Sequence, residues 1–121
     1  IVGTQAADTI RGNGSAHVIE GNAGNDTVAG GGGSDTLGLK PGFGNDMITD
    51  FDAVRNGGAA TQDYIELSGY GITAANFAQD VEISDIGADT LIVIDADQSQ
   101  TIRLVGIANA ASVTVDDFRF V

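Results

Sequence analysis

The hydrophobic positions in the first third of the chain recur at a fixed interval. Aliphatic residues stand nine positions apart from residue 10 to residue 37, and the stretch before each is rich in small or polar residues. Such a stretch favours a turn, because glycine tolerates positive φ and close backbone approach. The three residues around each aliphatic position alternate in the manner of a strand. Each nine-residue repeat therefore predicts one turn followed by one short strand.

Four tandem copies set the register of this pattern. Each copy begins with glycine and has an aliphatic residue at its eighth position; the first residues are Gly3, Gly12, Gly21 and Gly30. A period this strict is typical of a solenoid. If two repeats complete one coil, each residue stacks on the residue 18 positions later, with about 4.8 Å between the strands.

The sixth position of the repeat is acidic in three of the four copies. Degenerate copies continue the pattern: one with two inserted residues supplies Asp46, and one beyond a predicted loop over 49–57 supplies Asp63. The stacking then predicts two acidic edges. One carries Asp8, Asp26 and Asp46, and the other carries His17, Asp35 and Asp63.

Stacked carboxylates need a cation between them. Like charges at such a spacing repel by about 1 kcal/mol even in water, and by more near a protein. Calcium suits these edges because it accepts six to eight oxygens in flexible geometry, and glycine-rich turns expose backbone carbonyls. The repeat therefore predicts several calcium ions as cofactors.

The period of nine is lost after residue 67. A single turn of helix is expected over residues 72–78, with Thr73 as its N-cap. The remaining runs favour strands over 81–83, 90–94, 101–105 and 112–121. A solenoid exposes an apolar end unless a terminal unit covers it, so this segment is predicted to be the cap.

Composition narrows the function. The chain has 121 residues, no cysteine, and 17 acidic against 5 basic residues, for a net charge of −12. This charge disfavours nucleic acid and anionic membranes and favours divalent cations. No apolar run is long enough for a transmembrane helix. With one histidine and no cysteine, neither a zinc site, a thiol nucleophile nor a catalytic triad is indicated, so we expect the chain not to be an enzyme in itself.

These features resemble the RTX (repeats-in-toxin, hemolysin-type) family of calcium-binding modules. The resemblance rests on Gly21 to Gly38, on 46–51 and 63–68, and on the closing segments 104–107 and 117–120. The family occurs in serralysin-type proteases, hemolysins and the regulatory modules of mannuronan C5-epimerases. It implies an all-β fold: a right-handed parallel β-roll (β-solenoid) over residues 1–67, with a β-rich C-terminal cap over residues 68–121 in the same structural unit.

The resemblance also implies a ligand set, because in this family each ion lies between loops of one edge. Aspartates at position six and carbonyls of the first four positions hold it. Carried onto this sequence, the metal ligands are Asp8, Gly21, Ala23, Gly24, Asp26, Gly30, Gly31, Gly32, Gly33, Asp35, Gly44, Asp46 and Asp63. About three to five ions are expected. Thr4 and Ala6 replace usual glycines and should weaken the Asp8 site, and His17 is a poor calcium ligand.

The implied function is that of a non-catalytic module in a larger, secreted bacterial protein. It would fold on binding calcium outside the cell and stabilise a neighbouring domain or assist export. The ending Asp116-Asp117 followed by Phe118 to Val121 is similar to the acidic-then-hydrophobic tail of type I secretion substrates. Because the sequence starts at Ile1 rather than Met, we expect it to be a piece of a longer chain.

The alternative is a polysaccharide-binding regulatory module that contacts alginate, as in secreted epimerase-type enzymes. Binding a polyanion needs basic side chains, and only five are present, among them Lys40 and Arg55. The charge of the chain disfavours this alternative, although bound calcium would offset several negative charges.

Overall fold

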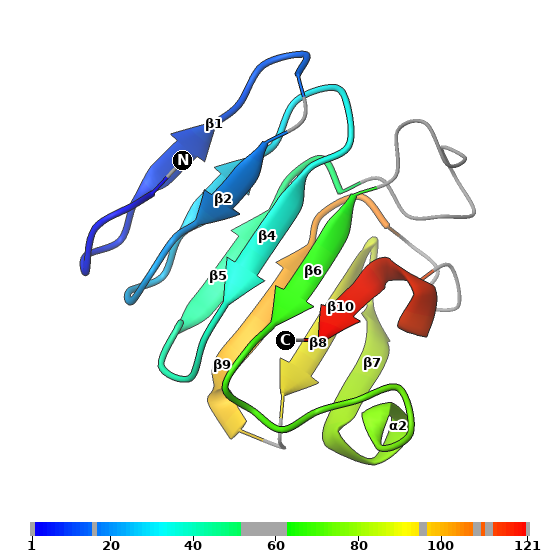
Figure 1. The fold of residues 1–121 in the computed structure, drawn as a ribbon. Coiled ribbons are helices and arrows are strands. Elements are labelled where there is room, and N and C mark those ends of the chain that lie inside the picture. Colours follow the sequence, from blue (N-terminus) through cyan, green and yellow to red (C-terminus); the bar gives the residue numbers. More distant parts are fainter. Residues whose placement is uncertain are drawn as a thin grey trace.

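The computed structural model shows a flattened coil of short strands that runs into a longer antiparallel segment (Figure 1). It describes residues 2–15, 17–51, 63–94, 97–107, 110 and 113–120. The predicted loop over 49–57 and the start of the last degenerate repeat lie mostly outside these residues. No helix in the described part of the chain is both long enough and apolar enough to span a membrane.

The strands form two sheets that face each other across a narrow core. One sheet has the order β1-β3-β5-β9-β8-β7, and the other β10-β6-β4-β2. The roll contributes β1 (Thr9–Arg11), β2 (Val18–Glu20), β3 (Thr27–Ala29), β4 (Thr36–Leu39), β5 (Asn45–Ile48) and β6 (Tyr64–Leu67). The second half contributes α2 (Phe77–Asp80), β7 (Val81–Ile86), β8 (Asp89–Ile94), β9 (Asp97–Leu104), the 3₁₀ turn η2 (Val115–Asp117) and β10 (Phe118–Phe120).

The register of the parallel strands confirms the predicted stacking. Thr9 pairs with Thr27, and Val18 pairs with Thr36, in each case 18 residues apart. The two-residue insertion lengthens the next step, so that Thr27 pairs with Met47. Successive strands alternate between the two sheets, as expected when two repeats make one coil.

The aliphatic position of each repeat points into the core. Ile10, Val28 and Ile48 come from one sheet and face Ile19, Leu37 and Ile65 from the other; all are buried. Strands β1, β2, β3 and β5 each add one buried apolar side chain, while β4 adds Leu37 and Leu39 and β6 adds Ile65 and Leu67, so the core of the roll is narrow. Little apolar area is available to stabilise it.

The second half continues both sheets and does not form a separate layer. β9 pairs in parallel with β5, and β10 pairs in parallel with β6. The strands β7, β8 and β9 are antiparallel and longer than those of the roll. The predicted strands over 81–83, 90–94 and 101–105 are confirmed with different bounds: β7 continues to Ile86, β8 begins one residue earlier, and β9 runs from Asp97 to Leu104.

Two local predictions for the second half were wrong. Thr73 does not cap the helix; α2 starts later, at Phe77, with Asn76 before it, and the Asn76 side chain accepts a hydrogen bond from the Thr73 amide (2.6 Å). The last strand is also shorter than predicted. A capping box between Thr114 and Asp117 turns the chain into η2 before β10 can begin.

Candidate metal sites

The edges of the roll hold the aspartates at position six in an amide-to-carboxylate ladder. On the first edge, defined by Asp8, Asp26 and Asp46, each amide donates to the carboxylate of the next coil. The distances are 2.8 Å from Asp8 N to Asp26 Oδ1 and 3.0 Å from Asp26 N to Asp46 Oδ1. One oxygen of each lower carboxylate is therefore fixed by the backbone above it.

The second edge, defined by His17, Asp35 and Asp63, repeats the arrangement. The His17 amide donates to Asp35 Oδ1 and the Asp35 amide donates to Asp63 Oδ1, both at 2.9 Å. The grouping of these residues on two edges, as predicted from the spacing, is confirmed. Because the donors of this ladder are backbone amides, the residue in the first coil can be His17 instead of an aspartate.

Three of these aspartates have a second oxygen that is buried without a hydrogen bond. They are Asp26, Asp35 and Asp46, and the unpartnered atom is Oδ2 in each. Their side chains are 1%, 5% and 2% exposed. A buried acceptor without a partner costs about 1–3 kcal/mol, and more when it is charged. Three such atoms at equivalent positions of a repeat form an arrangement that a bound cation would stabilise.

Burial also raises the pKa of each of these carboxyls. For Asp46 the pKa rises to about 7, mainly because of burial, with a further contribution from the negative charge of Asp26. Burial likewise raises the pKa of Asp26 and of Asp35. The ionised carboxylates are thus unfavourable in the metal-free fold, and a positive charge beside them would reverse this.

The glycines at position one leave room for the unpartnered oxygens. A side chain at Gly21 would collide with Asp26 Oδ2, and one at Gly30 would collide with Asp35 Oδ2. Each Oδ2 therefore lies directly against the backbone of its own loop.

Stacked loops approach each other through other glycines. Gly24, Gly31 and Gly44 have φ of 94°, 88° and 88°. A side chain at any of them would meet the backbone of the loop above, at Ala6, Asn13 or Gly24. Carbonyls and carboxylates are thus gathered in a small space, and oxygen atoms are the donors that calcium prefers.

Side chains alone do not complete a site. Among the described residues, no three His, Asp or Glu side chains gather closely enough to hold an ion. An ion on either edge would need backbone carbonyls as most of its ligands. The predicted glycines and Ala23 occupy the loops that could supply them.

The first two repeats differ from the inner ones. Asp8 Oδ2 accepts a hydrogen bond from the Thr4 amide (2.6 Å), and the Thr4 hydroxyl reaches the same carboxylate (3.0 Å and 3.1 Å). In the second repeat, His17 Nε2 accepts a hydrogen bond from the backbone amide of Asn13 (3.2 Å). The first coil thus satisfies its own position-six side chains.

Asp50 is a residue of the second edge that the sequence reasoning missed. Its carboxylate accepts hydrogen bonds from the amides of Gly30 (2.9 Å) and Gly31 (2.8 Å). Its charge contributes to raising the pKa of Asp35. With Asp35, Asp63 and several apolar side chains of the core it lines a cavity of about 20 Å³, the size of one water. Its offset of 20 from Gly30 equals that of Asp46 from Asp26, a signal that could have identified it.

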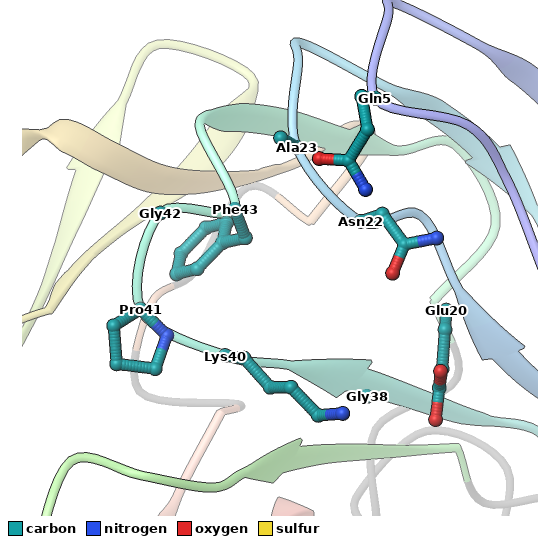
Figure 2. A pocket seen from close by; sticks show the side chains of 9 residues that line it. All are labelled: Gln5, Glu20, Asn22, Ala23, Gly38, Lys40, Pro41, Gly42 and Phe43. Carbon is teal, nitrogen blue, oxygen red and sulfur yellow. The ribbon is translucent and has the colours of Figure 1, made fainter.

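A larger pocket of about 180 Å³ opens beside the first edge, where the inserted residues widen the loop (Figure 2). Lys40 and Glu20 lie on one side of it, and the carboxamides of Gln5 and Asn22 on the other. Gln100 holds the widened loop, because its Oε1 accepts hydrogen bonds from Gly42 N (2.7 Å) and from the Tyr70 hydroxyl (2.5 Å). The pocket is polar and carries charges of both signs.

Comparison with known proteins agrees with this geometry. The family of the RTX calcium-binding nonapeptide repeat matches residues 2–37 in four copies. The fold is similar to the AlgE6R2 subunit of a mannuronan C5-epimerase from Azotobacter vinelandii, with a TM-score of 0.64, 24% identity and coverage of 99% of this chain and 91% of that one. The AlgE6R3 subunit gives a TM-score of 0.53 and 22% identity, covering 95% and 79%. No curated protein sequence matches significantly.

Proposed function

We propose that this domain, whose N-terminal part carries RTX calcium-binding repeats, is a non-catalytic module that folds as calcium binds and stabilises a neighbouring domain of a secreted protein. The repeat family and the β-roll fold support calcium binding. The observation that carries the proposal is the set of three buried, unpartnered Oδ2 atoms of Asp26, Asp35 and Asp46.

Coupling of folding to calcium follows from the energetics of these atoms. In the metal-free fold, three carboxylates are buried against one another's backbone with little apolar core to offset the cost. An ion that binds only the folded state adds its binding free energy to stability. Since the stacked loops do not exist in the unfolded chain, the two processes should occur together.

Ligands are assigned by edge. On the first edge we propose Asp26 and Asp46 with carbonyls from Gly21, Ala23, Gly24 and Gly44. On the second edge we propose Asp35 and Asp63 with carbonyls from Gly30 to Gly33, and Asp50 as an additional charge. Asp8 is the weakest of the proposed ligands, because Thr4 already occupies its carboxylate.

A calcium titration followed by circular dichroism and calorimetry tests the proposal. The β signal should increase as calcium is added, and magnesium should be much less effective because it demands octahedral geometry and dehydrates reluctantly. Asp46→Asn should weaken the response, whereas Asp116→Asn, an exposed residue outside the roll, serves as the matched control. A metal-free chain with the same spectrum and melting temperature as the calcium-loaded one would contradict the proposal.

Extracellular location and export by type I secretion form part of the proposal. The acidic-then-hydrophobic ending supports it by similarity, yet the same residues also have a structural role: Asp117 and Phe118 are buried, and β10 pairs with β6. Secretion of a chain with Phe118→Ser and Phe120→Ser separates the two roles. Export retained together with a lower melting temperature would contradict the export role of this tail.

A second candidate function is recognition of an acidic polysaccharide, supported by the pocket beside the first edge. Its Lys40, Gln5 and Asn22 offer one cation and two carboxamides, groups that bind carboxylates and hydroxyls. The net charge of −12 opposes it. Calorimetry with alginate oligomers, on the calcium-loaded chain and on its Lys40→Gln and Arg55→Gln variants, tests this candidate. Micromolar binding by the original chain that is lost in these variants would favour it. Absence of binding by the original chain would exclude it. Arg55 lies outside the described residues.

A further inference from the structure

The pocket beside the first edge exists because an insertion interrupts the repeat there. The degenerate copy over 39–48 contains two extra residues, and they widen the loop that lines the pocket. Gln100 holds this loop through the Gly42 amide (2.7 Å), and Gly69 lies so close to the Pro41 ring that a side chain there would approach it to 3.1 Å. The loop is thus fixed from two directions, as expected of a preformed binding site.

Polar groups gather in this pocket without satisfying one another. Within the part of the chain that the structure describes, the side chains of Gln5, Glu20 and Lys40 have no hydrogen bond or ion pair. Asn22 uses only its amide group, which donates to the Gly3 carbonyl (2.9 Å), so its Oδ1 is left for a ligand. Figure 2 shows the two carboxamides on one side of the space and the Lys40 and Glu20 side chains on the other. Donors and acceptors are therefore offered around a single space.

The charges of this pocket cancel, which decides the kind of ligand that it suits. Lys40 is a donor and Glu20 an acceptor, and the Gln5 carboxamide carries both kinds of group. A hydroxyl likewise donates one hydrogen bond and accepts others. A ligand with several neighbouring hydroxyls and no net charge can therefore serve all of these groups at once. We propose that the pocket binds one unit of a neutral sugar, a ligand that neither proposed function includes.

Charge and size both disfavour an acidic polymer at this place. A uronate carboxylate beside Lys40 would also face Glu20, and the chain as a whole carries a net charge of −12. The cavity of about 180 Å³ is smaller than the roughly 300–1,000 Å³ of pockets for drug-sized ligands. Such a volume suits a single ring rather than an extended chain. Binding of an acidic sugar is therefore the competing outcome of the test.

The position of the pocket links it to the first edge. One wall, with Asn22, belongs to the loop before Asp26, and another, with Gly42, belongs to the loop before Asp46. The ion proposed for this edge lies between these two loops, so it would set the width of the pocket. Sugar binding should therefore require calcium, and this part of the inference rests on the proposed calcium-coupled folding.

A sugar titration followed by amide NMR of the calcium-loaded chain tests the proposal. Methyl glucoside, methyl mannoside and methyl galactoside are each compared with the corresponding uronide, which differs only in the oxidation of C6 and hence in charge. We expect at least one neutral glycoside to shift the amides of Gly38, Lys40 and Gly42 with a dissociation constant of about 1–10 mM, because so small a ligand makes few contacts. Its uronide should bind at least about fivefold more weakly, because its charge is repelled.

Substitutions along one row of a sheet separate the pocket from its surroundings. Gly38 pairs with Glu20 of β2 on one side and with Glu66 of β6 on the other, and of these two glutamates Glu20 alone lines the pocket. Glu20→Ala should weaken binding of the neutral glycoside about tenfold. Glu66→Ala, the matched control with the same change in charge, should leave it unchanged. Gly38→Val should abolish binding, because a side chain there meets the Glu20 side chain at 3.4 Å and takes up space in the pocket.

Circular dichroism during the calcium titration separates this proposal from the proposed function. A chain that folds with calcium but binds no neutral glycoside at about 50 mM would overturn the sugar site alone. Sugar binding by a chain whose spectrum calcium does not change would support the site and contradict the proposed function. The site is also overturned if the uronide or free glycine, a zwitterion, binds as tightly as the neutral glycoside, or if Glu20→Ala and Glu66→Ala weaken binding equally. Glu20→Ala keeps the test decisive if Gly38→Val does not fold.

Discussion

The roll and the cap of this domain are built from the same kind of strand but are stabilised differently. Strands of the roll are three or four residues long, and each adds one or two buried apolar side chains to the core. Strands β8 and β9 of the cap are six and eight residues long, and Ile92, Ile94, Ile102 and Leu104 are fully buried. The cap therefore has longer strands around its apolar core, whereas we propose that the roll depends on ions bound at its edges.

A similar contrast exists within the roll. In the first coil, Thr4 satisfies the carboxylate of Asp8 and Asn13 contacts His17. In the inner coils, the equivalent oxygens of Asp26 and Asp35 have no partner. In the first coil, local hydrogen bonds thus supply partners to the position-six side chains that the inner coils leave without one.

The largest effect is expected from a methyl group at a position-one glycine. Gly21→Ala or Gly30→Ala would place a side chain against the Oδ2 of Asp26 or Asp35, displacing the oxygen from its loop. We expect loss of calcium binding on that edge and destabilisation by about 1–3 kcal/mol. Gly14→Ala, where nothing lies within 4 Å, is the control for calorimetry and thermal melts. An unchanged titration of Gly21→Ala would contradict the role of this loop.

Substitution of single aspartates should separate inner from outer repeats. Asp26→Asn removes an unpartnered ligand and is expected to weaken calcium binding by about tenfold or more. Asp8→Asn should have a much smaller effect, since its carboxylate is already held by Thr4. Isothermal calorimetry measures both. Equal losses of calcium affinity in the two variants would contradict the distinction between the first coil and the inner coils.

The pH dependence should reverse between the metal-free and calcium-loaded forms. The pKa of Asp46 is raised from 3.8 to about 7, so without calcium this group favours the fold below about pH 4 and loses that contribution as pH rises through 7. Calcium requires the ionised form, so its affinity should fall as the pH drops below 7. Denaturant melts from pH 4 to 8 with and without calcium test the sign. Parallel pH profiles in the two conditions would contradict it.

The smallest effect is expected at the junction between roll and cap. Gln100→Ala removes the acceptor for Gly42 N and the Tyr70 hydroxyl. At about 1 kcal/mol per hydrogen bond, stability should fall by about 1–2 kcal/mol, with a modest loss of calcium affinity at the first edge. Gln79→Ala, an exposed residue of α2, is the control in the same thermal melts.

Much of the roll could be predicted because its repeat fixes both period and register. Once Asp8, Asp26 and Asp35 are in phase, the stacking of the edges follows from counting residues. The cap could be predicted only as a set of strands. Its pairing with the roll, such as β9 alongside β5, depends on contacts between residues more than 50 positions apart, for which the sequence carries no periodic signal.

The site was partly visible in the sequence for the same reason. Position six stands out by repetition, but Asp50 does not, because the carboxylate reaches the Gly30 and Gly31 amides from a segment that has left the repeat. The hydrogen bonds between Thr4 and Asp8 could also be identified only from the structure. In the sequence, Thr4 is visible only as a substitution of the usual glycine, whereas in the structure its amide and hydroxyl donate hydrogen bonds to Asp8.

Hydrogen exchange with and without calcium, resolved by peptide, tests the central claim. The account predicts that chelation removes protection from the amides of β3, β4 and β5, whose position-six aspartates lose their counter-charge, while β8 and the part of β9 paired with it keep most of theirs. The first coil should lose protection only because its neighbours unfold. Equal protection of β3 to β5 in calcium and in chelator would contradict the claim that ions at the edges, rather than the narrow core, hold the roll together.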